Sequence, residues 1–241
     1  MRIALLYFGK ARSLRRTYPT QKEHVFDKLM ESGIEYDVYM HTWDTPDNVV
    51  WQTNTAYPED EDSYALLGAK LFQKDSQEEF LKSIDFSQYF YAHDYATKGH
   101  SHHGEWLPDL IRNHICALES QRRVYEIAQN SGIAYDAFMV IRPDAYFTSP
   151  LDTTVFQRLT DNMLVIPTWG SYEGYNDRMA IGTAYPIRTY THRLADLPEF
   201  RRTNGRIVAE KCLKLTVDKY HLSVETIDTQ FKLCRPDGTM V

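Results

Sequence analysis

The fold is decided by the stretch Tyr135-Asp-Ala-Phe-Met-Val-Ile-Arg-Pro-Asp-Ala-Tyr-Phe-Thr-Ser-Pro-Leu151. Residues 138–141 form a short apolar run, which predicts a buried β-strand. The run ends at Arg142-Pro143-Asp144, and a second apolar patch follows at once. In open α/β sheets, ligands bind at the carboxyl ends of the strands. The sequence therefore places Asp144 where such a sheet would bind its ligand.

The first forty residues predict a strand, a helix and a second strand. Residues 2–8 are apolar, and residues 34–40 alternate between apolar and polar side chains. Between them, Thr20 and Glu23 have the spacing of a capping box, and the helical stripe that follows ends at Gly33. Such a unit crosses over with a right-handed turn and places its two strands in parallel.

The rest of the chain continues this alternation of strands and helices. A long amphipathic helix is expected at residues 106–130, directly before the strand of the opening stretch. Beyond that stretch the patterns predict strands at 163–167, 179–182, 223–227 and 231–235, and helices at 186–194 and 206–219. The sequence therefore predicts an α/β fold with a mixed, mostly parallel sheet flanked by helices.

Residues 45–104 are the part of the chain with the weakest pattern. They are polar, aromatic and acidic, and short helices are expected at 65–72 and 77–84. We interpret the stretch as an elaborated connection at the ligand-binding end of the sheet, so that residues 1–241 form one domain.

The composition excludes several classes of protein. A chain of 241 residues with 43% hydrophobic side chains can bury a substantial core. A net charge of −6 argues against nucleic acid as a partner. No apolar run reaches the roughly 18 residues of a membrane span. The three cysteines are widely spaced, which indicates reduced thiols, a cytoplasmic location and no zinc site.

The frame around Asp144 resembles the Asp-x-Asp motif of nucleotide-sugar glycosyltransferases of the GT-A type. Arg142 takes the first acidic position of that motif and Asp144 the second. In outline, the chain is similar to small soluble transferases of this type from bacteria and large DNA viruses. The resemblance implies a GT-A-like (Rossmann-like) fold and a nucleotide-sugar donor, for which a UDP-sugar is the first choice.

The same resemblance implies a metal site. Asp144 would bind a divalent cation, Mn²⁺ or Mg²⁺, that stabilises the leaving diphosphate. Arg142 departs from the motif, because a guanidinium cannot ligate a cation, and this leaves the need for a metal open. Arg142 would instead pair with the phosphates or with a neighbouring carboxylate. By spacing alone, Arg-Pro-Asp also fits a simple turn at the end of a strand.

A second candidate is the basic loop after the first strand, which carries Gly9, Lys10, Arg12, Arg15 and Arg16. Basic side chains at the carboxyl end of a strand can hold a diphosphate. In GT-A folds this loop contacts the nucleotide. A solvated loop without a ligand is the alternative, and the sequence does not separate the two.

A third candidate is the loop after residues 163–167, which contains Glu173 and Asp177. Asp177 lies in an Asn-Asp-Arg stretch that resembles one in related small transferases. The resemblance implies that Asp177 is the acceptor-side carboxylate and, in an inverting enzyme, the general base, with Glu173 as second choice. The alternative is that the Asn-Asp pair only caps a turn. Aromatic neighbours that suit a sugar acceptor are Trp169, Tyr172 and Tyr175.

The sequence thus favours a hexosyl- or pentosyltransferase that acts on a nucleotide-sugar donor and a glycan or glycoside acceptor. Two other classes stay open: a non-catalytic module on the same fold that binds a glycan or nucleotide, and a nucleotidyltransferase. The sugar, the acceptor and the stereochemical outcome are not determined by the sequence.

Overall fold

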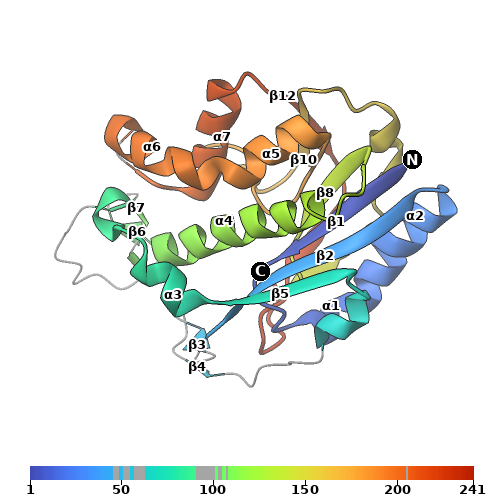
Figure 1. Cartoon of the computed structure of the whole chain (residues 1–241), viewed down its shortest axis with the longest axis horizontal. Coiled ribbons are helices and arrows are strands. Elements are labelled where there is room, and N and C mark those ends of the chain that lie inside the picture. Colours follow the sequence, from blue (N-terminus) through green and yellow to red (C-terminus); the bar gives the residue numbers. More distant parts are fainter. Residues whose placement is uncertain are drawn as a thin grey trace.

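The chain is described by a computed structural model, which covers residues 1–45, 49–50, 55–56, 63–90, 101–102, 105–106, 108–204 and 206–241. Its centre is a seven-stranded sheet in the order β12-β10-β11-β8-β1-β2-β5 (Figure 1). The strands are β1 (Arg2–Phe8), β2 (Glu35–Asp44), β5 (Leu71–Ser76), β8 (Ala137–Ile141), β10 (Met163–Pro167), β11 (Ala180–Gly182) and β12 (Ser223–Ile227).

The sheet is mixed and mostly parallel, as the sequence predicts. β1 pairs in parallel with β2 and β8, β2 pairs in parallel with β5, and β10 with β12. Only β11 runs the other way, between β8 and β10. The carboxyl ends of β1, β2 and β8 therefore meet at one edge of the sheet.

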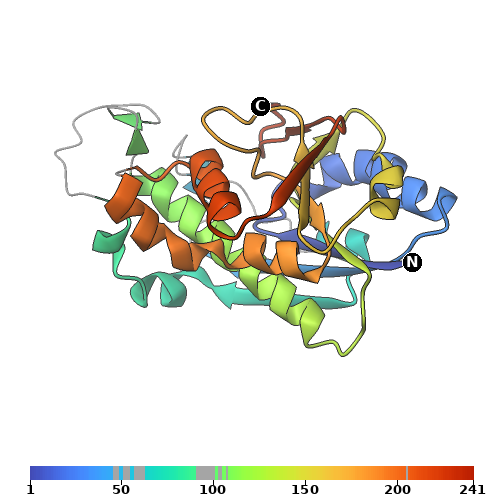
Figure 2. The same cartoon turned by 90° about the horizontal axis from the view of Figure 1, so that it is seen from above.

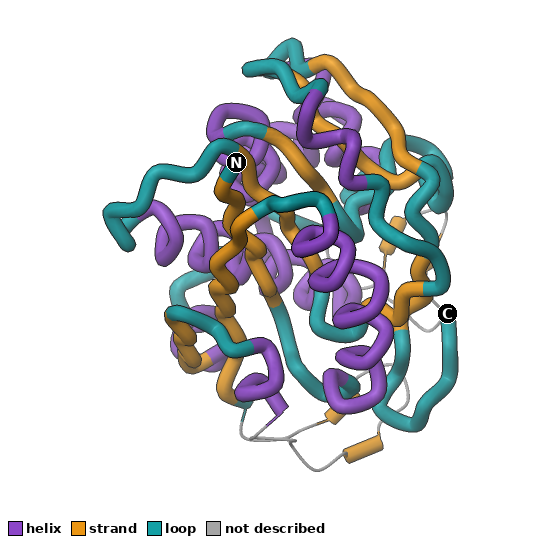
Figure 3. Tube along the Cα trace, turned by 90° about the vertical axis from the view of Figure 1, so that its right-hand side faces the viewer, coloured by secondary structure: helices purple, strands orange, loops and turns teal. Residues whose placement is uncertain are grey.

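Side chains alternate along β1 and supply two cores, because successive strand residues point to opposite faces. Ile3, Leu5 and Tyr7 pack toward α1 (Leu14–Gln21), the π-helical turn η1 (Lys22–Phe26) and α2 (Asp27–Glu31). Ala4, Leu6 and Phe8 pack toward α4 (Pro108–Gln129), α5 (Ala184–His192) and α7 (Ala209–Lys219). Figures 2 and 3 show helices on both sides of the sheet.

A third cluster of buried side chains packs around the first half of α4. It includes residues of α3 (Gln77–Lys82) and α6 (Leu197–Asn204). The remaining short elements are β3 (Val49–Val50), β4 (Thr55–Ala56), η2 (Ser63–Leu67), η3 (Phe86–Gln88), β6 (Ser101–His102), β7 (Glu105–Trp106), η4 (Thr153–Gln157) and η5 (Arg193–Asp196).

Three local predictions are wrong. The capping box expected at Thr20 does not form, because α1 (Leu14–Gln21) already contains Thr20, whose hydroxyl donates to the carbonyl of Thr17 at 2.9 Å. The helix expected at residues 65–72 is instead a short 3-10 turn followed by β5, because Leu71–Ser76 pairs with the exposed edge of β2. The basic loop is shorter than expected, because α1 already begins at Leu14. The helix expected at 77–84 is confirmed as α3 (Gln77–Lys82), and residues 46–48, 51–54, 57–62, 91–100 and 103–104 of the connection lie outside the described residues.

A small second sheet brings the end of the chain to the carboxyl end of β8. β13 (Phe231–Leu233) pairs antiparallel with β9 (Ala145–Phe147), the strand that directly follows Asp144. The pairing continues past β13, since the backbone N–H of Cys234 donates to the carbonyl of Asp144 at 2.8 Å. Arg235, the next residue, is thereby placed beside Asp144.

Within the described parts of the chain, no helix has both the length and the apolar content needed to cross a bilayer.

Candidate active site

A cavity of about 420 Å³ opens at the carboxyl ends of β1, β2 and β8. Its walls also include the first half of α4, the start of α7 and the end of β13. Six residues that the sequence singled out line it, namely Gly9, Lys10, Arg12, Arg142, Asp144 and Asp177. Ligand pockets in proteins are typically of this size or somewhat larger. The predicted segments after the first strand and after β8 thus form one site.

The loop after β1 is held by two hydrogen bonds from one backbone N–H. Gly9 has a φ of +88°, in the region that favours glycine. Its N–H donates to the carbonyl of His41 at 3.1 Å and lies 2.9 Å from Oγ of Ser120. The loop is therefore anchored to both β2 and α4, and these contacts fix the backbone from which the side chains of Lys10 and Arg12 extend.

Ser120, His41 and Asp75 lie in a row that looks like a catalytic triad. Oγ of Ser120 is 2.8 Å from Nδ1 of His41, and Nε2 of His41 is 3.1 Å from Asp75. Ser120 and His41 are fully buried, and the serine oxygen already bonds the N–H of Gly9. A substrate cannot reach it, so we interpret the row as support for the loop.

Arg142 and Asp144 form a two-pronged ion pair at the end of β8. Nε and Nη2 of Arg142 donate to the two carboxylate oxygens of Asp144, both at 2.7 Å. The turn between them is fixed from α1, where Thr17 and Gln21 donate to the carbonyl of Pro143 at 2.5 and 3.0 Å. The Arg-Pro-Asp turn is thus a rigid element that presents the pair to the cavity.

Two further guanidinium groups, those of Arg12 and Arg235, lie close enough to interact electrostatically with Asp144 and Arg142. Burial lowers the pKa of both, and the neighbouring Arg142 lowers it further, although Asp144 opposes the shift. Burial alone would raise the pKa of Asp144, but the surrounding guanidiniums outweigh it and the pKa is lowered. Three arginines therefore share one carboxylate, which leaves a net positive cluster.

This cluster does not fit a divalent cation at Asp144. Both carboxylate oxygens are occupied by Arg142, and two more cations stand nearby. Among the described residues, no group of three or more His, Cys, Asp or Glu side chains could hold a metal ion. The positive charge that a metal would supply to a phosphate is present here as guanidinium groups.

Asp177 lies at another part of the cavity wall and has a buried arginine behind it. Its carboxylate is 3.7 Å from Nη2 of Arg193, which is fully buried. Arg193 is oriented by Gln121, whose Oε1 accepts its Nη1 at 2.7 Å. The hydroxyl of Tyr190 donates to the backbone carbonyl of Asp177. Both the backbone and the side chain of Asp177 are therefore fixed by α4 and the α5–η5 segment.

Three predicted residues lie outside the cavity. Glu173 is exposed, and Nη2 of Arg206 lies 3.5 Å from its carboxylate. Arg15 and Arg16 are exposed on α1.

The aromatic residues of the loop at 168–178 divide into two kinds. Trp169 packs edge-on against Phe231, and its Nε1 donates to the carbonyl of Thr229. Tyr175 packs against the core under α7. Tyr172 is 79% exposed and has a φ of +37°. Of the three aromatic residues proposed to face an acceptor, Tyr172 is exposed, whereas Trp169 and Tyr175 are half-buried.

The structure adds site residues that sequence reasoning missed, namely Arg235, Glu210 and His114. The sequence contains a pattern that could have identified Arg235 as a site residue, since Arg235-Pro-Asp237 repeats the Arg-Pro-Asp of residues 142–144. No such pattern marks Glu210 or His114, because each lies within an ordinary helical pattern. Burial lowers the pKa of His114 to about 4, so its imidazole is neutral at pH 7.

Comparison with solved structures gives many distant similarities, among them the two that follow. Mouse xyloside xylosyltransferase 1, in its apo form, aligns over 94% of this chain and 85% of its own, with 10% identity and a TM-score of 0.48. The glycosyltransferase GlyE of Streptococcus pneumoniae TIGR4 aligns over 94% of this chain and 46% of its own, with 13% identity and a TM-score of 0.47. Similarities this distant do not indicate what this chain does.

Sequence comparison adds little. Residues 120–235, slightly less than half of the chain, match a family model described as a domain of unknown function, DUF7796. No curated protein matches the sequence. A functional proposal must therefore rest on the cavity itself.

Proposed function

We propose that this chain is a glycosyltransferase that moves a sugar from a nucleotide-sugar donor to a hydroxyl of a glycan or glycoside. A UDP-sugar is the first donor to test. In this proposal the Gly9–Arg12 segment and the Arg142–Asp144 turn bind the donor. Asp177 contacts the acceptor.

One observation carries the proposal, namely the convergence of Arg12, Arg142 and Arg235 on one cavity at the carboxyl end of the sheet. A planar guanidinium pairs with phosphate oxygens through two parallel hydrogen bonds, and several such groups suit a diphosphate. Among the described residues, no carboxylate forms an ion pair with Arg12 or Arg235. Their charge is therefore available to a ligand.

The arrangement divides the chemistry between the two parts of the cavity. The arginines would hold the diphosphate and stabilise the charge that develops on it as the bond from the sugar C1 breaks. The acceptor hydroxyl would bind beside Asp177, where a carboxylate can take its proton while its oxygen attacks C1. A divalent cation, which the motif resemblance implies, has no step assigned to it because Asp144 does not fit one.

The Arg142–Asp144 ion pair favours a second candidate, a non-catalytic module that binds a nucleotide or glycan. In such a module the pair would only shape the cavity. A nucleotidyltransferase is the third possibility, and it differs in releasing pyrophosphate from a nucleoside triphosphate.

An assay of donor hydrolysis and transfer separates these classes. The chain is incubated with a panel of nucleotide sugars and simple glycosides, and released nucleoside diphosphate and pyrophosphate are measured. A transferase releases the diphosphate slowly without acceptor and faster with one. Binding without release would support the module, and pyrophosphate release from a triphosphate would overturn the proposal.

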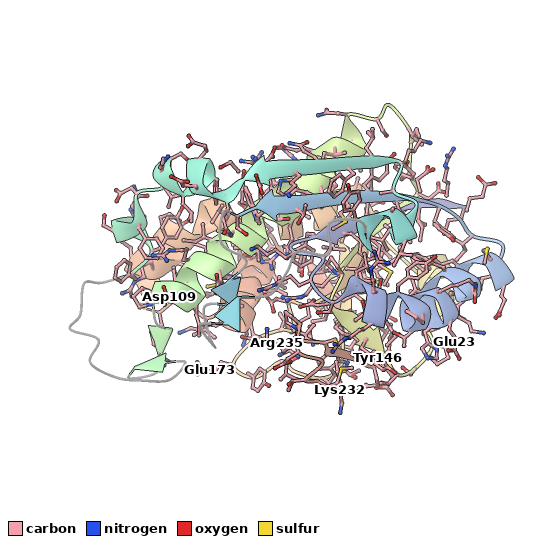
Figure 4. All side chains as sticks on the ribbon, turned by 90° about the horizontal axis from the view of Figure 1, so that it is seen from below. Glu23, Asp109, Tyr146, Glu173, Lys232 and Arg235 are labelled. Atoms are coloured by element: carbon pink, nitrogen blue, oxygen red, sulfur yellow. The ribbon has the colours of Figure 1, made fainter. Side chains whose placement is uncertain are left out.

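Matched variants on β13 and just beyond it test the donor side. Arg235→Ala removes a cation from the cavity, whereas Lys232→Ala removes one from the exposed side of β13, three residues earlier. Figure 4 labels both residues. We expect the first variant to lose affinity for UDP and the second to keep it. Equal affinities in the two variants would contradict a diphosphate site at Arg235.

A further inference from the structure

A second carboxylate lies in the cavity wall with Asp177. Glu210, in the first turn of α7, lines the cavity together with Asp177 and Arg178. It is 8% exposed, and Asp177 is near enough for its charge to act on Glu210. The two carboxylates come from segments more than thirty residues apart in the chain, so the fold alone brings them together.

The position of Glu210 relative to Asp177 is fixed by the backbone. The N–H of Tyr175 donates to the carbonyl of Glu210 at 3.0 Å. Gly174 allows this approach, because a Cβ at that position would lie 1.9 Å from the same carbonyl oxygen. The start of α7 is therefore joined directly to the loop that carries Asp177.

The two carboxylates have different surroundings. Asp177 faces the guanidinium of Arg193 at 3.7 Å, and Arg142 also acts on it. Within the described parts of the chain no cation forms an ion pair with the carboxylate of Glu210, although the charge of Arg178 acts on it. Burial, and then the charge of Asp177, raises the pKa of Glu210. A pair of carboxylates with unlike surroundings is the usual basis for unlike roles.

We propose that Glu210 is the general base of the transfer and that Asp177 holds the acceptor hydroxyl in place. The inference rests on the proposed function and specifies an inverting reaction. The acceptor oxygen forms a bond to C1, and the bond from C1 to the diphosphate oxygen breaks with its electron pair staying on the diphosphate. The acceptor proton passes to the carboxylate of Glu210 and from there to water.

The surroundings of the two carboxylates are the reason for assigning them different roles. Asp177 is held by the buried Arg193 at 3.7 Å and by Tyr190 through its backbone carbonyl, which suits a group that positions the acceptor hydroxyl. Burial and the charge of Asp177 raise the pKa of Glu210, although Arg178 opposes the shift, and a base is most effective when its pKa lies near the working pH. Glu173, the second choice from the sequence, lies outside the cavity and is paired with Arg206.

The test compares Glu210→Gln and Asp177→Asn by pH–rate profiles with a donor and acceptor that the wild-type chain uses. Glu210→Gln should lower kcat by about 100- to 10,000-fold, keep the KM for the acceptor, and lose the acidic limb of the profile. Asp177→Asn should raise the KM for the acceptor and keep that limb. The anomeric configuration of the product, read by NMR, should be inverted relative to the donor.

Asp218→Asn is the matched control, since it removes an exposed carboxylate from the same helix. UDP affinity and thermal stability are measured for each variant, so that a misfolded protein is recognised. Retention of configuration, or loss of the acidic limb in Asp177→Asn with a normal limb in Glu210→Gln, would overturn the assignment of Glu210 alone. A wild-type chain that neither hydrolyses nor transfers any donor would overturn the proposed function itself.

Discussion

Asp144 shows how the meaning of one residue depends on its neighbours. The motif resemblance implies a metal ligand, whereas in the structure both oxygens accept hydrogen bonds from Arg142. A carboxylate in that setting orients a guanidinium and reduces the repulsion among three arginines. We therefore expect Asp144 to act through Arg142.

Asp144→Asn should reduce transfer by about 100- to 1,000-fold while the fold survives, because a misplaced charge-stabilising group costs that much. Affinity for UDP should change less, since the variant removes a negative charge from beside three cations. Asp237→Asn is the control. It alters the second Arg-Pro-Asp, where the exposed carboxylate accepts the N–H of Thr239 at 2.8 Å and does not line the cavity. Near-normal transfer by a folded Asp144→Asn protein would reject the role.

At the scale of elements, the site depends on contacts that hold loops to the sheet. The loop after β1 is anchored to β2 and α4 through His41 and Ser120, and the loop at 168–178 is joined to α7 at Glu210. Both anchors hold loops that line the cavity, so their loss should change stability and activity together.

The His41 anchor predicts a loss of stability in acid. Burial, partly opposed by Asp75, lowers the pKa of His41 to about 4, whereas an unfolded histidine titrates near 6.5. Between these values the unfolded chain binds a proton that the folded chain does not. The free energy of unfolding is therefore highest above about pH 6.5 and falls as the pH is lowered toward 4. His114 adds a contribution of the same sign.

Urea unfolding at pH 7 and pH 5 measures the effect. Each buried histidine should contribute roughly 2 kcal/mol to the difference between the two curves. His41→Gln should show a smaller difference than the wild-type chain, whatever its stability at pH 7. An unchanged difference would mean that His41 is protonated in the folded state.

The contact between Gly174 and α7 predicts a coupled defect. Gly174→Ala places a Cβ against backbone atoms of Glu210 and Lys211, which must move apart at a cost of roughly 1–3 kcal/mol. The shift should also disturb Asp177 and Glu210 and reduce transfer. Gly33→Ala is the control, because its site is open but has a φ of +66°, which costs roughly 1–2 kcal/mol. If both variants keep full transfer, the contact does not position the site.

For the whole molecule, the sequence predicts the sheet better than it predicts the site. Strands such as β10 and β12 follow from local patterns and have the predicted bounds. Asp144 and Arg12 could be placed at one edge because parallel strands end together. Arg235 and Glu210 could not, since they reach the cavity through the pairing of β13 with β9 and the docking of α7. These contacts join residues distant in sequence, which no periodic pattern records.

A ligand held by such distant segments should stabilise the whole chain. UDP at about 100 times its dissociation constant adds roughly 2.7 kcal/mol, or about 5–10 °C in Tm for a chain of this size. Since the arginines supply the positive charge, we expect this shift in EDTA to match the shift in Mn²⁺. UMP should give a smaller shift, and Arg235→Ala should lose it while Lys232→Ala keeps it. A shift that disappears in EDTA and returns with Mn²⁺ would instead restore Asp144 as a metal ligand, because only a bound cation would then complete the diphosphate site.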